Sequence, residues 1–183
     1  MNIKNMTALI IIDQQKGIAS PKLGYRNNQG AESVMLNLLS QWRKLGWPIF
    51  HIKHSSADPE SVFWPEQEGF EFKPGFFPLL NEVMIEKKTP CTFSNTNLEV
   101  LLKEKGLKSI IVVGASTNNS VEATVRTGAC KGFSVTVIED ACFAFSKMDY
   151  FGRERTAEEV HAMSLANLEN EYASIIQSSE VKL

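Results

Sequence analysis

Cysteine and histidine are scarce in this 183-residue sequence. The three cysteines, Cys91, Cys130 and Cys142, are odd in number and form no Cys-x-x-Cys pair. A disulfide framework or a structural zinc site is therefore not expected. His51 and His54 lie three residues apart, but no Asp-x-His partner accompanies them. The sequence accordingly predicts a protein without a metal ion.

Long apolar runs and an excess of one charge are also absent. No stretch approaches the ~18–20 apolar residues of a membrane span, and residues 1–6 do not resemble a signal peptide. The 19 basic and 21 acidic residues give a net charge of −2. The sequence therefore lacks the excess of basic residues that is typical of proteins that bind nucleic acid or an anionic membrane. We expect a cytoplasmic protein whose partner is a small molecule, with no nucleic acid and no membrane.

No repeat, low-complexity tract or Pro/Gly/Ser-rich linker divides the chain, so a single domain is expected over residues 1–183. Apolar runs typical of buried strands occupy residues 7–13, 48–53, 83–86, 109–114 and 133–140, and an edge strand is expected within 172–177. Helical spacing occupies residues 31–45, 97–105, about 120–131 and 156–171. This alternation predicts a three-layer α/β/α fold with a mostly parallel central sheet and right-handed crossovers.

Three local signals mark the expected helix ends. Gly46 follows the first helical pattern as a C-cap. Thr96 and Glu99 have the spacing of a capping box, as do Thr156 and Glu159. Each pair predicts the start of a helix.

The central stretch, residues 109–131, consists of a β-branched apolar run, a polar loop and a helical pattern. Its helical residues share one face at spacings of three and four, and Gly132 is placed to end the helix. Ser120 is therefore expected at or just inside the helix N-terminus. Unpaired backbone N–H groups at that position favour a nucleophile or an anionic intermediate. The alternative is that Ser120 is only an N-cap.

Three reactive side chains follow the carboxyl ends of expected strands: Asp13, Lys87 and Ser120. In a parallel sheet these ends share one edge, where ligands bind. A carboxylate that accepts a proton, an ammonium group and a hydroxyl over backbone N–H donors make an acyl-transfer site. The alternative is that the acid and the lysine are solvated loop residues.

The segment from 54 to 78 is long, aromatic and irregular. Such a loop is typically functional in a compact domain. Trp64 and Phe70 are the candidates for contact with a bound substrate. The alternative is that these rings only pack the loop onto the sheet.

Taken together, the motifs resemble the isochorismatase-like hydrolases, also called the cysteine hydrolase superfamily. The resemblance extends over nearly the whole chain, and these segments carry it: Ala8-Leu-Ile-Ile-Ile-Asp13-Gln-Gln, Ile85-Glu-Lys87 with Phe93 and Thr96-Asn-Leu-Glu, Val113-Gly-Ala-Ser-Thr-Asn-Asn-Ser120-Val-Glu-Ala-Thr, and Glu139-Asp140-Ala141. It implies an isochorismatase-like, Rossmann-like fold. It also implies a small-molecule hydrolase without a cofactor that forms a homo-oligomer, dimeric or tetrameric.

The resemblance further implies an Asp-Lys-Cys triad, whose Asp falls on Asp13 and whose Lys falls on Lys87, with Lys88 as the alternative. The position of the nucleophilic Cys is occupied by Ser120. An alcohol is far less acidic than a thiol and is normally activated by a histidine-class base. Cys91 is a further candidate at the rim of the site.

The resemblance also implies a cis peptide bond between Ala115 and Ser116, which aims backbone N–H groups, including that of Ser120, at an oxyanion. Ala115, Ser116 and Asn119 are therefore assigned to substrate or oxyanion binding.

Three functions remain open. The first is hydrolysis of an amide-type C–N bond with Ser120 at the nucleophile position. The second is hydrolysis of a vinyl ether of the isochorismate type without a covalent step, with Asp13 as acid and base. The third is a catalytically silent binding protein. The residues alone also leave open that Ser120 replaces a natural cysteine.

Overall fold

The computed structural model describes residues 6–182. Its main sheet has six strands in the order β3-β2-β1-β4-β5-β8, and each neighbouring pair is parallel. The strands are β1 (Ala8–Ile12), β2 (Ile49–His54), β3 (Val83–Lys87), β4 (Ser109–Ala115), β5 (Ser134–Phe143) and β8 (Ser174–Ile176). The predicted parallel sheet and the edge strand within 172–177 are confirmed.

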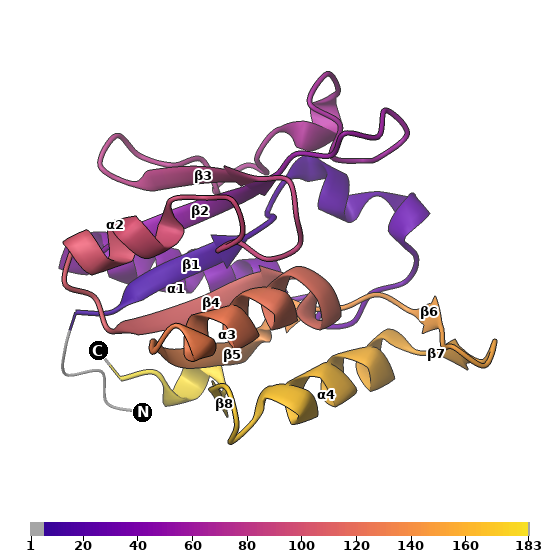
Figure 1. Cartoon of the computed structure of the whole chain (residues 1–183). Coiled ribbons are helices and arrows are strands. Elements are labelled where there is room, and N and C mark those ends of the chain that lie inside the picture. The colour runs from indigo at the N-terminus through magenta and orange to yellow at the C-terminus, as the bar shows by residue number, and fades with distance from the viewer. Residues whose placement is uncertain (1–5, 183) are drawn as a thin grey trace.

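Helices cover both faces of this sheet (Figure 1). The helix α1 (Ala31–Leu45) packs on one face, and α2 (Leu98–Glu104), α3 (Glu122–Cys130) and α4 (Ala157–Leu168) lie on the other. Within β1, Ile10 and Ile12 join the core under α2 and α3, whereas Leu9 and Ile11 join the core under α1. Both faces of the strand are buried, which explains its continuous apolar sequence.

The predicted helix ends are partly confirmed. The helix α1 has the predicted bounds, and Gly46 caps it in the left-handed region at φ 64°. The capping box of Thr156 and Glu159 is present at the start of α4. This helix ends at Leu168, earlier than predicted, because the chain turns extended at the following residue.

The capping box predicted for α2 is wrong. Asn97 is the N-cap residue of this helix, and its side chain makes no capping hydrogen bond. The Glu99 carboxylate instead pairs with Lys103 at 2.7 Å and Lys131 at 2.5 Å. Two ion pairs therefore take the place of the expected hydrogen bond from the Glu99 carboxylate to the backbone. The short antiparallel pair of β6 (Lys147–Met148) and β7 (Glu154–Arg155) was not predicted from the sequence.

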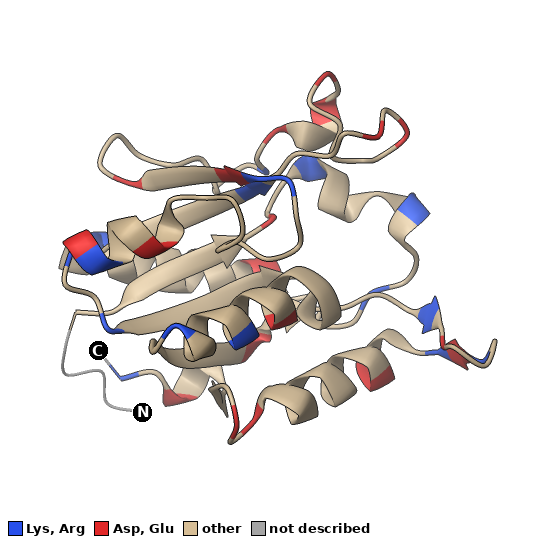
Figure 2. Cartoon of the chain, in the orientation of Figure 1, with Lys and Arg blue, Asp and Glu red and all other residues tan. Residues whose placement is uncertain are grey.

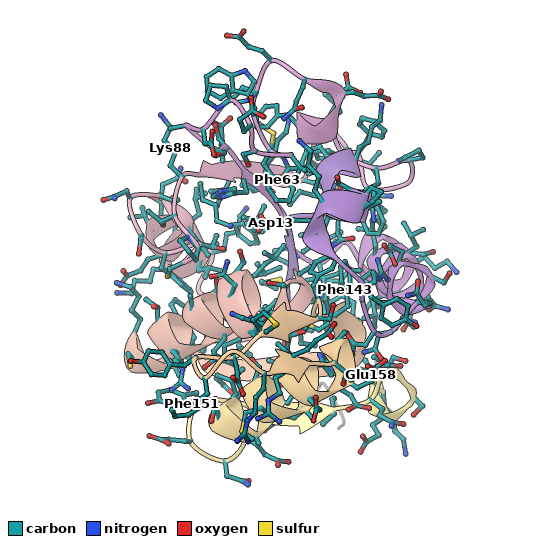
Figure 3. All side chains as sticks on the ribbon, turned by 90° about the vertical axis from the view of Figure 1, so that its right-hand side faces the viewer. Asp13, Phe63, Lys88, Phe143, Phe151 and Glu158 are labelled. Carbon is teal, nitrogen blue, oxygen red and sulfur yellow. The ribbon has the colours of Figure 1, made fainter. Side chains whose placement is uncertain are left out.

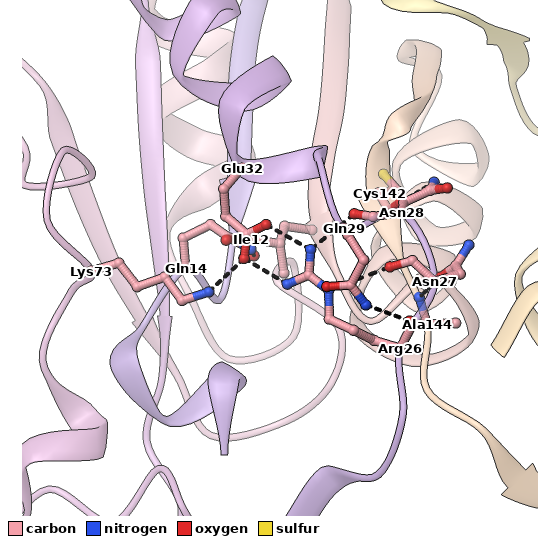
Figure 4. A network of polar contacts seen from close by, with 10 residues as sticks. All are labelled: Ile12, Gln14, Arg26, Asn27, Asn28, Gln29, Glu32, Lys73, Cys142 and Ala144. Atoms are coloured by element: carbon pink, nitrogen blue, oxygen red, sulfur yellow. Dashed lines mark hydrogen bonds and ion pairs between the residues drawn. The ribbon is translucent and has the colours of Figure 1, made fainter. Parts of the chain in front are cut away.

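A polar network fastens the loops around the carboxyl edge of the sheet to α1 (Figure 4). Arg26 donates to both carboxylate oxygens of Glu32 at 2.6 Å, and Lys73 donates to one of them at 2.6 Å. Burial alone would raise the pKa of Glu32, but the hydrogen bonds from Arg26 and Lys73 lower it to about 2. The network joins the loop after β1 to the long aromatic loop, so both loops are held at one edge.

Asn28 links the loop after β1 to strand β5 at the same edge of the sheet. Its side-chain amide donates to the carbonyls of Glu139 and Cys142 in β5, at 3.1 and 2.7 Å.

Among residues 6–182, no helix has the length and apolar character that a membrane crossing requires.

Candidate active site

Three buried side chains meet at the carboxyl edge of the sheet. Asp13 follows β1, Lys87 is the last residue of β3, and Ser120 lies in the turn after β4. Lys87 Nζ donates to Asp13 Oδ2 at 2.8 Å and to Ser120 Oγ at 3.2 Å. The three residues are only 3%, 1% and 6% exposed, respectively. The structure thus brings together the three reactive residues that the sequence singled out.

Asp13 is held in an unusual backbone conformation. Its φ of 55° lies in the left-handed region, and its N–H donates to the Ile52 carbonyl of β2 at 3.0 Å. One carboxylate oxygen, Oδ1, is buried and has no hydrogen-bond partner among the described residues. Burial raises the pKa of this carboxyl above its usual range, against the opposing effects of Lys87 and Ser120. Asp13 is therefore a stronger base than an exposed aspartate.

Ser120 belongs to a π-helical turn, Thr117–Val121, that precedes α3. The peptide bond between Ala115 and Ser116 at the start of this turn is cis. The Ser116 carbonyl accepts hydrogen bonds from the backbone N–H groups of Asn119 and Val121, at 3.1 and 3.2 Å. The Ser120 hydroxyl makes no helix-capping bond and contacts Lys87 instead. The alternative that Ser120 is only an N-cap is therefore wrong.

Helix α4 supports the turn from behind, which the sequence did not reveal. His161 Nδ1 lies 2.8 Å from the Thr117 hydroxyl, and Ser164 Oγ donates to the Thr117 carbonyl at 3.0 Å. Ser164 also lies 2.7 Å from the Glu122 carboxylate. Burial lowers the pKa of His161, which favours the neutral imidazole. These contacts fix the first residue of the turn and thereby the position of Ser120.

A pocket of about 360 Å³ opens over the three reactive groups. Its wall is formed by residues of five loops and strand ends: Asp13, Ile18, Leu23, His54, Phe63, Lys88, Pro90, Ala115, Ser116, Asn119, Ser120 and Phe145. The predicted Ala115, Ser116 and Asn119 are therefore at the wall. Lys87 lies in the buried cluster beneath it, and Lys88, the alternative position, lies at the pocket itself.

The prediction for the aromatic residues was wrong. Trp64 and Phe70 do not line the pocket, whereas Phe63 and Phe145 do. The ring of Phe70 instead packs against the Lys53 ammonium group, 3.5 Å from the ring centroid. Figure 3 shows Phe63 above Asp13, on the side of the long loop. The correct loop was identified, but the choice of ring depends on turns that periodicity does not predict.

His54 is a pocket residue that the sequence did not single out for this role. Its Nδ1 lies 3.5 Å from Lys87 Nζ, and its ring packs edge-on against Phe63 with centroids 5.6 Å apart. Burial and the charge of Lys87 lower the pKa of His54 to about 4. The sequence did contain a signal for this role. His54 follows the second predicted strand, just as Asp13 follows the first.

Other candidates lie away from the pocket. The Cys91 thiol donates to Thr127 Oγ1 at 3.2 Å and does not line the pocket. His51 lies 2.8 Å from the carboxylate of Glu82 and forms no pair with His54. Across residues 6–182, no group of three or more His, Cys, Asp or Glu side chains is arranged to hold a metal ion.

The family model described as the isochorismatase domain matches residues 7–180. The chain belongs to the isochorismatase family. Its fold is therefore the isochorismatase-like α/β fold, and its family is one of hydrolases. The strand ends that carry Asp13, Lys87 and Ser120 all fall inside the matched region.

The similarity to proteins of known sequence and structure extends over almost the entire chain. The isochorismatase family protein YrdC of Bacillus subtilis is 37% identical over 174 residues, which cover 95% of this chain and 93% of YrdC. A crystal structure of an isochorismatase-family protein from Chromobacterium violaceum is 44% identical, covers 98% of this chain and 93% of its own, and superposes with a TM-score of 0.94. Nicotinamidase 3 of Arabidopsis thaliana is 25% identical over 197 residues, covering 97% and 87% of the two chains.

Proposed function

We propose that this isochorismatase-family protein hydrolyses an amide-type C–N bond of a small molecule, with Asp13, Lys87 and Ser120 as its reacting groups. The observation that carries the proposal is the hydrogen-bonded chain from Asp13 through Lys87 to Ser120, buried in the protein on one side and bordered by a pocket on the other. The name of the relative nicotinamidase 3 points to an amide substrate, which supports the choice of bond.

In the proposed first step, Ser120 Oγ attacks the carbonyl carbon of the bound amide while its proton passes to Asp13. Burial raises the pKa of Asp13, and a carboxylate with a raised pKa is a better proton acceptor. The Lys87 ammonium, 3.2 Å from Ser120 Oγ, offsets negative charge that develops on that oxygen. The C–N bond then breaks, and the leaving nitrogen takes the proton from Asp13.

In the second step, water attacks the ester carbonyl on Ser120. Asp13 accepts a proton from this water, the ester C–O bond breaks, and the proton returns to the Ser120 oxygen. The carboxylic acid product leaves and the starting state is restored. The same carboxyl group thus acts as base and then as acid in each of the two steps.

The turn that begins at the cis peptide is the proposed oxyanion site. Ala115, Ser116 and Asn119 line the pocket next to Ser120. We assign the stabilisation of the tetrahedral oxyanion to the backbone N–H groups of Ser116 and Ser120, which belong to this wall. Donors fixed in advance in a poorly hydrated site are worth more than donors in water.

The test is hydrolysis of a panel of small primary amides, carbamoyl compounds and isochorismate by the parent protein and three variants. We expect Asp13→Asn to lower kcat by about 10²–10⁴-fold. We expect Ser120→Cys to raise kcat, because a thiol gives up its proton far more readily than an alcohol. Mass spectrometry should detect an acyl ester on the peptide that contains Ser120. Full activity of Ser120→Ala on an amide would contradict the covalent route.

A second candidate is hydrolysis of a vinyl ether by proton transfer alone. The observation that favours it is the raised pKa of Asp13, which allows this carboxyl group to carry a proton to a substrate carbon atom. In that case Ser120→Ala keeps most of the activity on isochorismate, Asp13→Asn abolishes it, and no ester forms. The same panel of variants therefore separates the two functions.

A further inference from the structure

His54 and Lys88 line the pocket, and the proposed hydrolysis gives neither of them a role. Both come from the end of the β2–β3 pair, where His54 is in register with Lys87 and Lys88 is the next residue. Figure 2 shows this end of β3 as a short basic segment. His54 and Lys88 thus reach the pocket from the ends of two adjacent strands.

The contact with Lys87 fixes which nitrogen of His54 carries the proton. A lysine ammonium group has three N–H donors and no lone pair. Asp13 Oδ2, Ser120 Oγ and His54 Nδ1 lie 2.8, 3.2 and 3.5 Å from Lys87 Nζ, so each can accept one of these donors. Nδ1 is therefore the acceptor nitrogen, and the neutral ring carries its proton on Nε2. Within residues 6–182 this Nε2–H has no hydrogen-bond partner, which leaves it available to a ligand.

The charges at the pocket do not cancel. Asp13 is the one acidic side chain that residues 6–182 contribute to the wall, and the buried Lys87 beside it compensates its charge. Lys88 is exposed and forms no hydrogen bond or ion pair among the described residues. The pocket therefore carries one uncompensated positive charge. Phe63 and Phe145 make the remainder of the wall aromatic.

We propose that the pocket selects substrates that carry a carboxylate, which accepts a hydrogen bond from His54 Nε2–H and pairs with the Lys88 ammonium group. The apolar body of the substrate packs between Phe63 and Phe145. This inference names the substrate class of the hydrolase proposed above and rests on that function for the position of the bond that is cleaved. A charge-assisted hydrogen bond contributes about ten- to hundredfold to affinity.

Binding of two isosteric probes, benzoate and nitrobenzene, tests the inference without any turnover. Titrations followed by NMR would compare the parent protein with Lys88→Gln, His54→Phe and His54→Gln. We expect the parent to bind benzoate at least about tenfold more tightly than nitrobenzene. Lys88→Gln and His54→Phe should each reduce benzoate affinity by about tenfold and change nitrobenzene affinity by less than about twofold. His54→Gln keeps an N–H donor and should restore part of the loss. Lys108→Gln, a change of an exposed lysine outside the pocket wall, is the matched control.

Several outcomes would overturn the inference. These are equal affinity for the two probes, failure of benzoate to bind up to about 20 mM, or losses at Lys88 and His54 that are the same for both probes. A general disturbance of the pocket would produce the last of these. Turnover separates the two proposals with the amide pair succinamate and butyramide. Equal kcat/KM for the pair contradicts the carboxylate inference alone, and carboxylate-selective binding with no amide turnover contradicts the hydrolase proposal alone.

Discussion

The buried ion pair of Lys87 and Asp13 gives the sharpest prediction about stability. The two side chains are 0% and 5% exposed and 2.8 Å apart. The change Lys87→Met replaces the lysine with an unbranched side chain that is one atom shorter and uncharged, so it leaves Asp13 buried without a counter-charge. Removing one partner of a buried pair typically costs about 3–5 kcal/mol. We expect a loss of that size in the free energy of unfolding at pH 7.

The pH dependence of this loss identifies its cause. Burial raises the pKa of Asp13 above its ordinary value of 3.8, and Lys87 is the largest opposing influence. Without Lys87 the folded-state pKa of Asp13 rises further, so the folded protein keeps a proton that the unfolded chain has lost. Stability then falls as the pH rises, by up to about 1.4 kcal/mol per pH unit. Between pH 5 and pH 7 the cost of Lys87→Met should grow by up to about 2.7 kcal/mol.

Urea unfolding of the parent and of Lys87→Met at pH 5, 6 and 7 measures this dependence. Lys108→Met, which removes an exposed lysine, is the control for charge. The double variant Asp13→Asn with Lys87→Met removes both charges and should recover most of the loss, because paired removal of a buried ion pair is often neutral or stabilising. A cost that is the same at all three pH values, or a double variant less stable than Lys87→Met, would refute the argument.

Three further predictions concern the scaffold. Gly114→Ala should lower stability by more than about 2 kcal/mol, because its φ is +121° and a Cβ would lie 2.2 Å from a backbone oxygen of β1; Gly30→Ala, with no atom within 4 Å, should change the melting temperature little. Thr156→Ala removes the N-cap of α4 and should cost about 1 kcal/mol in urea unfolding. Burial alone would raise the pKa of Glu82, but hydrogen bonds, the strongest from Arg43, lower it from 4.5 to about 2. The ionised Glu82 therefore stabilises the folded protein above pH 4.5, and this stabilisation should be lost as the pH falls from 4.5 to about 2. Glu82→Gln should abolish this part of the acid dependence, measured as Tm between pH 2 and pH 5.

The fold could be predicted because the central strands of its sheet, such as β1 and β4, are buried on both faces. A run such as Ala8–Ile12 has no polar face, and only a sheet covered by helices on both sides accommodates it. The position of Asp13, Lys87 and Ser120 could be predicted for a related reason. Each follows a strand, and the carboxyl ends of parallel strands meet at one edge.

The rest of the site depends on contacts between residues distant in the sequence. Phe63, rather than Trp64, reaches the pocket because of consecutive turns in the long loop, and neither periodicity nor residue type distinguishes the two rings. The π-helical turn of Ser120 is held by His161 of α4, 41 residues later in the chain. Helical spacing alone predicts an ordinary helix start there. His54 carried the same strand-end signal as Asp13, but its contact with Lys87 exists only in three dimensions.

Among the described residues neither a cysteine nor a methionine lines the pocket, and Ser120 presents a hydroxyl group at the position of the proposed nucleophile. A thiolate in that place would be open to stepwise oxidation by peroxide and to capture by electrophiles. A serine hydroxyl does not undergo this stepwise oxidation. Burial raises the pKa of the Cys142 thiol to about 12, so this sulfur also stays protonated and unreactive. Under the function proposed above, the serine therefore exchanges intrinsic nucleophilicity for tolerance of oxidants, and we expect peroxide to leave the activity unchanged at concentrations that inactivate a thiol hydrolase.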